Sequence, residues 1–222
     1  MSRASGIHIR EVSTSDPTAV PDWNTAAQAV IDTGKRSSER GWTPATSGNF
    51  SVRSTDGDIA ITRSGVDKGA LALTDILRQP LARPLLSGSS AEAGLHIRLY
   101  ADHADIGAVF HTHSHAASVL GRLHVDQSTI VLEGWEMQKA LQGVRTHEAR
   151  VLVPVFANTQ AIDALAEQVA TRFLRAPEEA LLAPGYLIAG HGLYAWGADA
   201  QQAWRHLEAL NAMLGYLLAL RG

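Results

Sequence analysis

Two histidines, one residue apart, end a buried hydrophobic run in the middle of the chain. The run Ala108–Phe110 leads into His111 and His113, and Ser114 follows as a candidate helix N-cap. Because strand side chains alternate between two faces, His111 and His113 point to the same side. Ligand sites in α/β sheets tend to lie at strand ends. The pair therefore suits a divalent metal, and the alternative is two satisfied polar histidines at a strand end.

The composition limits both the class of protein and the kind of metal site. The chain has 222 residues, of which 45% are hydrophobic, enough for the core of one large α/β domain. Its net charge of −3 favours neither nucleic acid nor an anionic membrane as a partner. There is no cysteine, so disulfides and thiolate ligands are excluded. A metal site must then use histidine with carboxylates or water.

The N-terminal segment shows no targeting signal. Met1–Ser15 is polar and lacks the apolar region of a signal peptide. No stretch of the sequence is apolar for long enough to span a membrane. We therefore expect a cytoplasmic protein, with a flexible N-terminal arm at residues 1–20 and a single catalytic domain at residues 21–222.

Helical and extended patterns are mixed along the chain without strict alternation. Helices are expected from Pro21 and Asp22 to about Arg40, from Ser89 to about Tyr100, at Ser114–Leu120, from about Gly134 to Gln142, at Gln160–Arg175 and at Asp199–Arg221. Strands are expected at Phe50–Arg53, Asp58–Thr62, near Leu73–Leu77, Gly107–His113, Thr129–Leu132, Val151–Phe156, Tyr186–Ala189 and Leu193–Trp196. This order predicts one α/β/α domain with a mixed sheet rather than a doubly wound parallel sheet.

A third histidine lies between two glycines late in the chain. Because Gly190 and Gly192 tolerate unusual backbone angles, the turn can hold the His191 imidazole at a fixed angle beside a neighbouring strand. With His111 and His113 it would give three ligands and an open position, which is the catalytic arrangement for zinc. The alternative is a tight turn whose histidine faces solvent.

Three loops share hydroxyl groups, backbone N–H groups and little bulk. They are Thr46–Asn49, Ser64-Gly65 and Ser89-Ser90. Ser89-Ser90 also begins a helix, and a helix N-terminus favours an anion. Loops of this kind would hold a phosphate monoester where they converge. Taken singly, each is better explained as an ordinary turn or a helix cap.

Two carboxylates have competing explanations. Glu92 has the spacing of a capping box with Ser89, which taken alone favours a structural role over a carboxylate that faces a metal. His96 is four residues after Glu92, so it faces the same way and is expected to pack behind the site. Glu136 and Lys139 are i, i+3 neighbours on one helical face, an arrangement that is usual for a solvated surface pair.

Together these motifs resemble the class II aldolase and adducin family, from about Ala27 to Leu218. The His-Thr-His strand, the Gly-His-Gly turn, the Thr-x-Gly-Asn loop, the Ser-Gly loop and the Ser-x-Glu helix start occur in the family's order. Within the family the chain is most similar to the dehydratases. The segments that carry this narrower likeness are Gly41–Asn49, Ser90–Glu92 and Glu136–Lys139.

The resemblance implies a three-layer α/β/α domain with a central mixed, largely antiparallel sheet. It implies one zinc ion per subunit, bound by His111, His113 and His191. The residues implied to bind a sugar phosphate are Gly48, Asn49, Ser64, Gly65 and Ser90, with Lys68 nearby. Glu136 matches the acid/base position of the dehydratases, and Glu92 matches the carboxylate that binds metal and moves a proton in the aldolases. The family usually forms homotetramers with sites at subunit interfaces.

The implied reaction is dehydration of 5-methylthioribulose 1-phosphate to 2,3-diketo-5-methylthiopentyl 1-phosphate, in methionine salvage. The alternative is a class II sugar-phosphate aldolase. Ala91 stands where the aldolases have a second serine, and the chain ends at Gly222 without the longer tail of some aldolases; both features weaken that alternative. A non-catalytic adducin-like binding module is a further alternative, which the presence of all three histidines disfavours.

Overall fold

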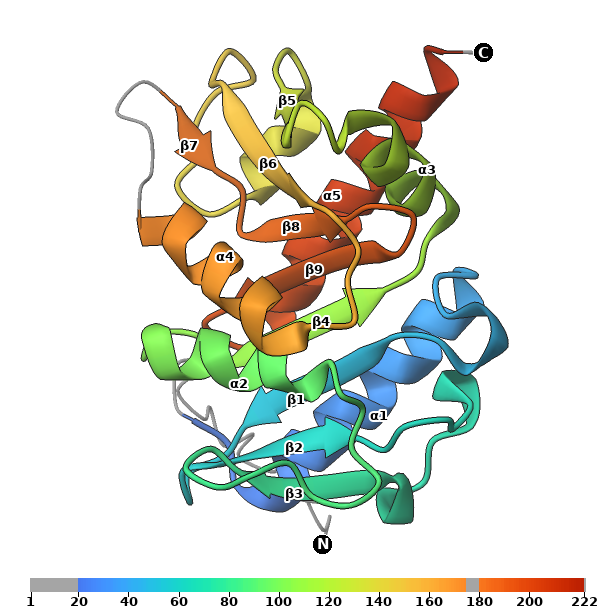
Figure 1. Cartoon of the computed structure of the whole chain (residues 1–222), viewed down its shortest axis with the longest axis vertical. Helices are drawn as coiled ribbons and strands as arrows, with labels where there is room; N and C mark the ends of the chain where they lie inside the picture. Colours follow the sequence, from blue (N-terminus) through green and yellow to red (C-terminus); the bar gives the residue numbers. More distant parts are fainter. Residues whose placement is uncertain (1–19, 175–179, 222) are drawn as a thin grey trace, which may run out of the picture.

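A nine-stranded mixed sheet forms the middle layer of the molecule (Figure 1). The computed structural model describes residues 20–174 and 180–221, so the arm expected at residues 1–20 lies, apart from Val20, outside the described residues. The strand order is β3-β2-β1-β4-β9-β8-β6-β5, with β7 also paired to β6. Strand β6 is parallel to β7 and β8, and the other neighbours are antiparallel. The sheet is therefore mixed and largely antiparallel, as expected.

The elements follow the predicted order closely. The strands are β1 (Asn49–Arg53), β2 (Asp58–Thr62), β3 (Ile76–Pro80), β4 (Ala108–Thr112), β5 (Thr129–Leu132), β6 (Val151–Phe156), β7 (Leu181–Leu182), β8 (Gly185–Ile188) and β9 (Gly192–Gly197). The α-helices are α1 (Trp23–Glu39), α2 (Ala93–Asp102), α3 (His115–His124), α4 (Ile162–Leu174) and α5 (Ala200–Ala219).

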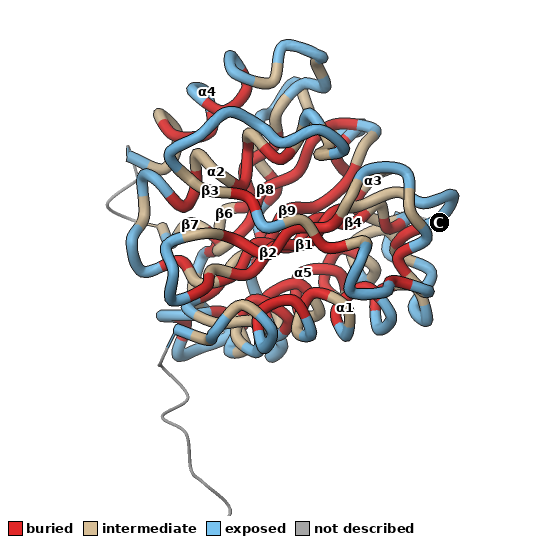
Figure 2. Tube along the Cα trace, turned by 90° about the horizontal axis from the view of Figure 1, so that it is seen from below, coloured by how far each residue is buried: buried red, intermediate tan, exposed pale blue. Residues whose placement is uncertain are grey.

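Helices cover both faces of the sheet and complete the three layers. In Figure 2, α1 and α5 lie on one side of the strands, and α2 and α4 lie on the other. The two faces of β4 belong to different apolar clusters, because Phe110 packs toward α1 and α5 whereas Val109 packs toward α2 and α4. His111 follows in the alternation and shares the face of Val109. The first histidine of the pair is thereby directed toward the α2 side of the sheet.

Three helix starts are capped by a side chain, and one of these caps, Ser114, was predicted. The side chains of Asp22, Ser114 and Asp199 accept hydrogen bonds from backbone N–H groups in the first turns of α1, α3 and α5. The cap of α3 directly affects the site, since Ser114 turns the chain out of β4 immediately after His113. The expected N-terminal helix, the final helix and the helix after the histidine pair are confirmed.

The last helix packs an apolar stripe against the sheet. Ala203, Leu207, Leu210 and Leu214 of α5 are fully buried against the strands. Over the residues that the structure describes, no helix is both long enough and apolar enough to cross a lipid bilayer.

Two local predictions were wrong. The strand expected near Leu73–Leu77 is a 3-10 turn, Leu73–Asp75, followed by β3, because the Asp75 carboxylate binds the Ala72 N–H and closes the turn. The helix expected from Gly134 to Gln142 is the short 3-10 helix η4 (Glu136–Ala140). There the Gln138 side chain bonds the backbone at Trp135 and Ala149, which anchors the segment to the loop before β6.

Candidate metal centre

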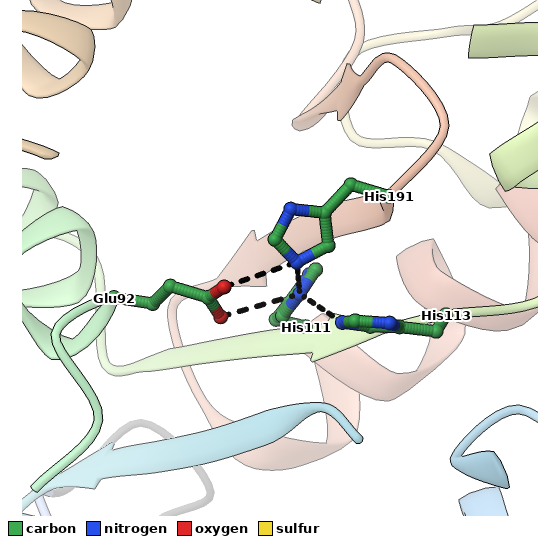
Figure 3. Close-up of side chains that lie close together, drawn as sticks. All are labelled: Glu92, His111, His113 and His191. Carbon is green, nitrogen blue, oxygen red and sulfur yellow. Dashed lines mark hydrogen bonds and ion pairs between the residues drawn. The ribbon is translucent and has the colours of Figure 1, made fainter. Parts of the chain in front are cut away.

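Four side chains from three separate segments converge at the end of β4 (Figure 3). One ligand atom from each of Glu92, His111, His113 and His191 lies within 4.8 Å of all the others. The His111 Nε2 atom lies 2.9 Å from His113 Nε2 and 3.3 Å from His191 Nε2. Glu92 Oε1 lies 3.0 Å from His191 Nε2. The structure therefore brings together the three predicted histidines and adds the Glu92 carboxylate to them.

Glycine permits the close backbone approach that the cluster needs. A Cβ atom on Gly192 would lie 2.0 Å from the Thr112 carbonyl oxygen, so only glycine lets β9 pair this closely with β4. Gly190 has a φ of +64°, which forms the turn before His191. The Ser118 hydroxyl of α3 donates to the His191 carbonyl at 2.7 Å and fixes the turn to the helix. Together these contacts set the position of the His191 imidazole.

His111 is held as a neutral imidazole with its lone pair toward the cluster. Its Nδ1 atom lies 3.1 Å from the Leu193 carbonyl oxygen, which can only accept, so Nδ1 carries the proton and Nε2 is free of one. The ring is fully buried and stacks on Tyr194 at 4.0 Å between centroids. Burial lowers the pKa of His111, and burial together with the neighbouring His191 ring lowers the pKa of His113 to about 4.

The donor set fits a divalent cation. The unprotonated Nε2 atom of His111 lies within 3.3 Å of the Nε2 atoms of both His113 and His191, so the three ring nitrogens point to one place. Three imidazoles and a carboxylate are ligands that zinc and other borderline divalent metals accept. The hydrogen bond from His111 Nδ1 to a backbone carbonyl is the usual second contact of a metal-binding histidine. We therefore regard these four residues as a candidate metal centre.

Glu92 faces the histidines and does not form the expected capping box. Helix α2 begins at Ala93, and Glu92 makes no side-chain cap bond to the described backbone. Its Oε2 atom instead accepts a hydrogen bond from Asn49 Nδ2 at 2.8 Å. Burial alone would raise the pKa of Glu92, but the hydrogen bond with His191 and the electrostatic influence of the His111 and His191 rings outweigh it and lower the pKa strongly. Tertiary partners therefore override the local capping signal.

The three small-residue loops surround one cavity of about 260 Å³ beside the cluster. Its lining includes the predicted residues Gly48, Asn49, Ser64, Gly65, Lys68 and Ser90, together with His113 and Glu92. The buried hydroxyl of Ser47, which also lines it, has no hydrogen-bond partner among the described residues. A buried hydroxyl without a partner is costly unless a ligand or water satisfies it. The cavity thus offers an incomplete polar lining next to the candidate metal centre.

Two cations line this cavity in different ways. The Lys68 side chain is 1% exposed, and its Nζ atom donates to the Thr46 and Val66 carbonyls at 2.8 Å each, which leaves one ammonium proton. Burial lowers the pKa of Lys68. Arg63 is half-buried, and its guanidinium lies over Gly88, close to Ser90 in the chain. It forms no ion pair with any residue that the structure describes, and the sequence analysis did not single it out.

Glu136 lies outside the cluster. It is 73% exposed on η4, where it forms an ion pair with Lys139 at 2.6 Å and lies 3.7 Å from His147 Nδ1. The predicted i, i+3 contact with Lys139 is therefore present, on a 3-10 rather than an α-helical turn. Among the described residues, Glu136 is neither in the four-residue cluster nor in the lining of the cavity beside it.

A larger cavity of about 770 Å³ lies elsewhere, between β6 and α4. Its lining among the described residues includes Phe156, Ala164 and Gln168 and none of the predicted site residues. The ligand-type side chains converge at the smaller cavity instead.

The chain is similar to known proteins over most of its length. The sequence matches the class II aldolase and adducin N-terminal domain over residues 28–218. A methylthioribulose-1-phosphate dehydratase from Bradyrhizobium is 61% identical over 199 residues, which are 89% of this chain and 92% of the relative. An enzyme of the same name from Sorangium cellulosum is 48% identical over 201 residues, covering 89% and 93%. The crystal structure of an L-fuculose-1-phosphate aldolase from Thermus thermophilus superposes with a TM-score of 0.70 at 28% identity, covering 88% and 95%.

Proposed function

The chain belongs to the class II aldolase and adducin family, and from this premise we propose that it is a metal-dependent dehydratase. The proposed substrate is 5-methylthioribulose 1-phosphate and the product is 2,3-diketo-5-methylthiopentyl 1-phosphate. The observation that carries the proposal is the convergence of Glu92 and three histidines beside a hydroxyl-rich cavity, in a chain 61% identical to a dehydratase of this name. We also propose that the enzyme is a cytoplasmic homotetramer of methionine salvage.

We propose that His111, His113 and His191 hold one zinc ion, with Glu92 beside it. When bound there, the metal supplies Lewis-acid polarisation of the substrate's carbonyl group. The protein's part is to keep the three imidazoles neutral and correctly turned, which the Leu193 carbonyl does for His111.

The phosphate of the substrate is proposed to occupy the adjacent cavity. Backbone and hydroxyl donors of Gly48, Ser64, Gly65 and Ser90 line it, and the unpartnered Ser47 hydroxyl adds another. Lys68 and Arg63 supply positive charge for the dianion. With the phosphate held at one end, the C2 carbonyl and C3 hydroxyl of the sugar would reach the histidines.

The reaction needs one proton removed from C3 and one delivered to the departing C4 hydroxyl, which leaves as water; the enol formed becomes the diketone. We propose Glu136 as the general acid/base. Because Glu136 lies outside the cluster in one chain, it would act on the site of a neighbouring copy in the proposed tetramer. Glu92 lies within 3.0 Å of His191 and is proposed to bind at the metal rather than to carry the main proton transfer.

The direct test is to incubate the purified, zinc-loaded protein with 5-methylthioribulose 1-phosphate and to identify the products by mass spectrometry. The expected result is a single product that has lost one water. Cleavage between C3 and C4 into a three-carbon ketone phosphate and a methylthio aldehyde would overturn the proposal. That outcome would favour an aldolase instead, the candidate supported by the structural similarity to the L-fuculose-1-phosphate enzyme.

A further inference from the structure

A buried chain of hydrogen bonds leads from the far end of α2 to Glu92. Tyr100, Ser51, His96 and Asn49 are each at most 4% exposed, and their side chains contact one another in that order. The Tyr100 hydroxyl lies 2.9 Å from Ser51 Oγ, which lies 2.7 Å from His96 Nδ1. His96 Nε2 contacts Asn49 Oδ1, and Asn49 Nδ2 donates to Glu92 Oε2 at 2.8 Å. Of these five residues, only Asn49 and Glu92 belong to the candidate metal centre or to the cavity beside it.

The spacing of these residues explains why they meet. Glu92, His96 and Tyr100 recur every four positions and form one stripe along α2. Asn49 and Ser51 are two apart on β1 and point to the same face of the sheet. Their neighbours Phe50 and Val52 pack into the opposite apolar cluster, so the polar side of β1 faces the polar stripe of α2.

In each hydrogen bond of this series, only one of the two partners can be the donor. The Asn49 carbonyl oxygen can only accept, so His96 Nε2 carries the proton. The buried His96 is neutral, because desolvation lowers its pKa to about 3 despite the nearby charge of Glu92, and its Nδ1 atom therefore accepts from the Ser51 hydroxyl. Ser51 has one proton to give, so the Tyr100 hydroxyl must donate to Ser51. The series of hydrogen bonds thus begins with the Tyr100 hydroxyl as donor and ends with the Glu92 carboxylate as acceptor.

From this we propose that His96 is a positioning residue for the metal centre. Its Nε2–H fixes the orientation of the Asn49 amide, because a flipped amide would place oxygen against the Glu92 carboxylate and NH₂ against an N–H group. The correctly turned amide then holds Glu92 toward His111 and His191. This inference rests on the proposed metal site, and it assigns the orientation of Glu92 to a residue that contacts neither metal nor substrate.

The test compares His96→Leu with His96→Gln in the full-length protein. Leucine fills similar space without a donor, whereas the glutamine amide can still donate to Asn49. Zinc affinity is measured by competition with a chelator, and the visible spectrum of the cobalt-loaded protein reports the ligand geometry. We expect His96→Leu to weaken zinc binding by about 10- to 100-fold and to change the cobalt spectrum, as loss of a supporting contact does elsewhere. His96→Gln should stay within a few-fold of wild type, as should the control His103→Leu at the end of α2.

The inference is overturned if folded His96→Leu binds zinc as tightly as the wild type, with an unchanged cobalt spectrum. If that variant does not fold, Ser51→Ala replaces it, because loss of the Ser51 hydroxyl leaves His96 Nδ1 without its donor and loosens the hold of the ring against Asn49. Ser51→Ala should weaken zinc binding by at least about threefold, and wild-type affinity would again overturn the inference. A wild-type protein that binds zinc but releases no water from the substrate would contradict the proposed function and leave the role of His96 standing.

Discussion

Glu136 and Lys139 form an ion pair of 2.6 Å on the exposed surface of η4, away from the cluster formed by Glu92 and the three histidines. The hydrogen bond from Lys139 lowers the pKa of Glu136, so in a single chain this carboxylate is ionised. To donate a proton it would need the more buried environment that a neighbouring subunit would supply. The position of Glu136 therefore links the proposed acid/base role to assembly.

The first prediction concerns this carboxylate. Glu136→Gln keeps the side chain's shape and removes proton transfer, so turnover should fall by about 100- to 10,000-fold. Bound zinc should not change, because Glu136 is not among the four converging residues. Steady-state kinetics and metal analysis of the same preparation test both points.

The matched control is Glu133→Gln, which removes an exposed carboxylate three positions earlier in the chain. Its turnover should remain within about twofold of wild type, as is usual for surface changes. Glu136 is not the acid/base if Glu136→Gln and Glu133→Gln have similar rates.

A second prediction concerns Arg63, which lines the proposed phosphate cavity without an ion-pair partner in the described chain. A hydrogen bond to a charged group contributes about 1.5–3 kcal/mol, so Arg63→Gln should raise KM by roughly tenfold or more. The turnover number should change little, since the phosphate does not react. Arg83→Gln, in the exposed loop after β3, is the control and should leave KM unchanged. An unchanged KM in Arg63→Gln would show that this arginine does not bind the phosphate.

A third prediction concerns stability at Lys68. Its ammonium joins the Thr46 loop to Val66, so Lys68→Met leaves two carbonyls without their donor. We expect a loss of about 1–3 kcal/mol in the free energy of unfolding, measured by urea denaturation. Lys35→Met on the exposed side of α1 should change it by less than about 0.5 kcal/mol. Equal stability of the two variants would contradict a tethering role for Lys68.

A fourth prediction concerns pH and His206 of α5. The buried ring lies with Nδ1 2.6 Å from the Trp196 carbonyl oxygen, so it donates there, and Nε2 accepts from the Gln142 N–H at 3.1 Å. Burial lowers the pKa of His206 and Arg205 lowers it further, against the raising effects of the Trp196 carbonyl and Asp199. Above pH 6.5 neither the folded nor the unfolded state gains a proton at this site. Below it the unfolded state binds a proton first, so stability falls as the pH decreases toward the folded-state pKa.

His206→Gln removes this titration while keeping an amide that can donate and accept. The variant should be less stable than wild type at pH 7.5, and the difference should shrink as the pH falls from about 6.5 to 5. Urea denaturation of both proteins at a series of pH values measures this difference in the free energy of unfolding. A difference that is constant over this range would show that His206 is not buried in its neutral form.

Much of the fold was predictable because its signals are local. Asp22, Ser114 and Asp199 cap helices through their own first turns, and the His111–His113 spacing follows from strand alternation. The stripe of α5 is likewise a property of one segment. The wrong predictions also concerned local signals: at Leu73–Leu77 the Asp75 carboxylate closes a turn on Ala72, and at Gly134–Gln142 the Gln138 side chain bonds the more distant Ala149 backbone.

The parts of the site that were not predicted depend on tertiary contacts. The capping-box spacing at Glu92 is a real local signal, and Asn49 and the histidines outweigh it only once β1, β4 and α2 have packed together. The four-residue spacing of Glu92 and His96 predicted that His96 packs behind the site, but it did not indicate which side chains His96 contacts. That spacing acquires meaning only with Asn49 and Ser51 on the facing strand. Arg63 gave no signal at all, because its environment is set by the approach of Gly88.

The most direct test of the account is the rate of water loss from 5-methylthioribulose 1-phosphate as zinc is returned to chelator-stripped protein. Because Glu92, His111, His113 and His191 form the one set of converging ligands in the described part of each chain, the rate should be close to zero without metal. It should then rise linearly and reach its maximum at one equivalent of zinc per chain. A full rate in the metal-free protein, or a rate that does not respond to added zinc, would show that the reaction does not depend on a metal at this cluster.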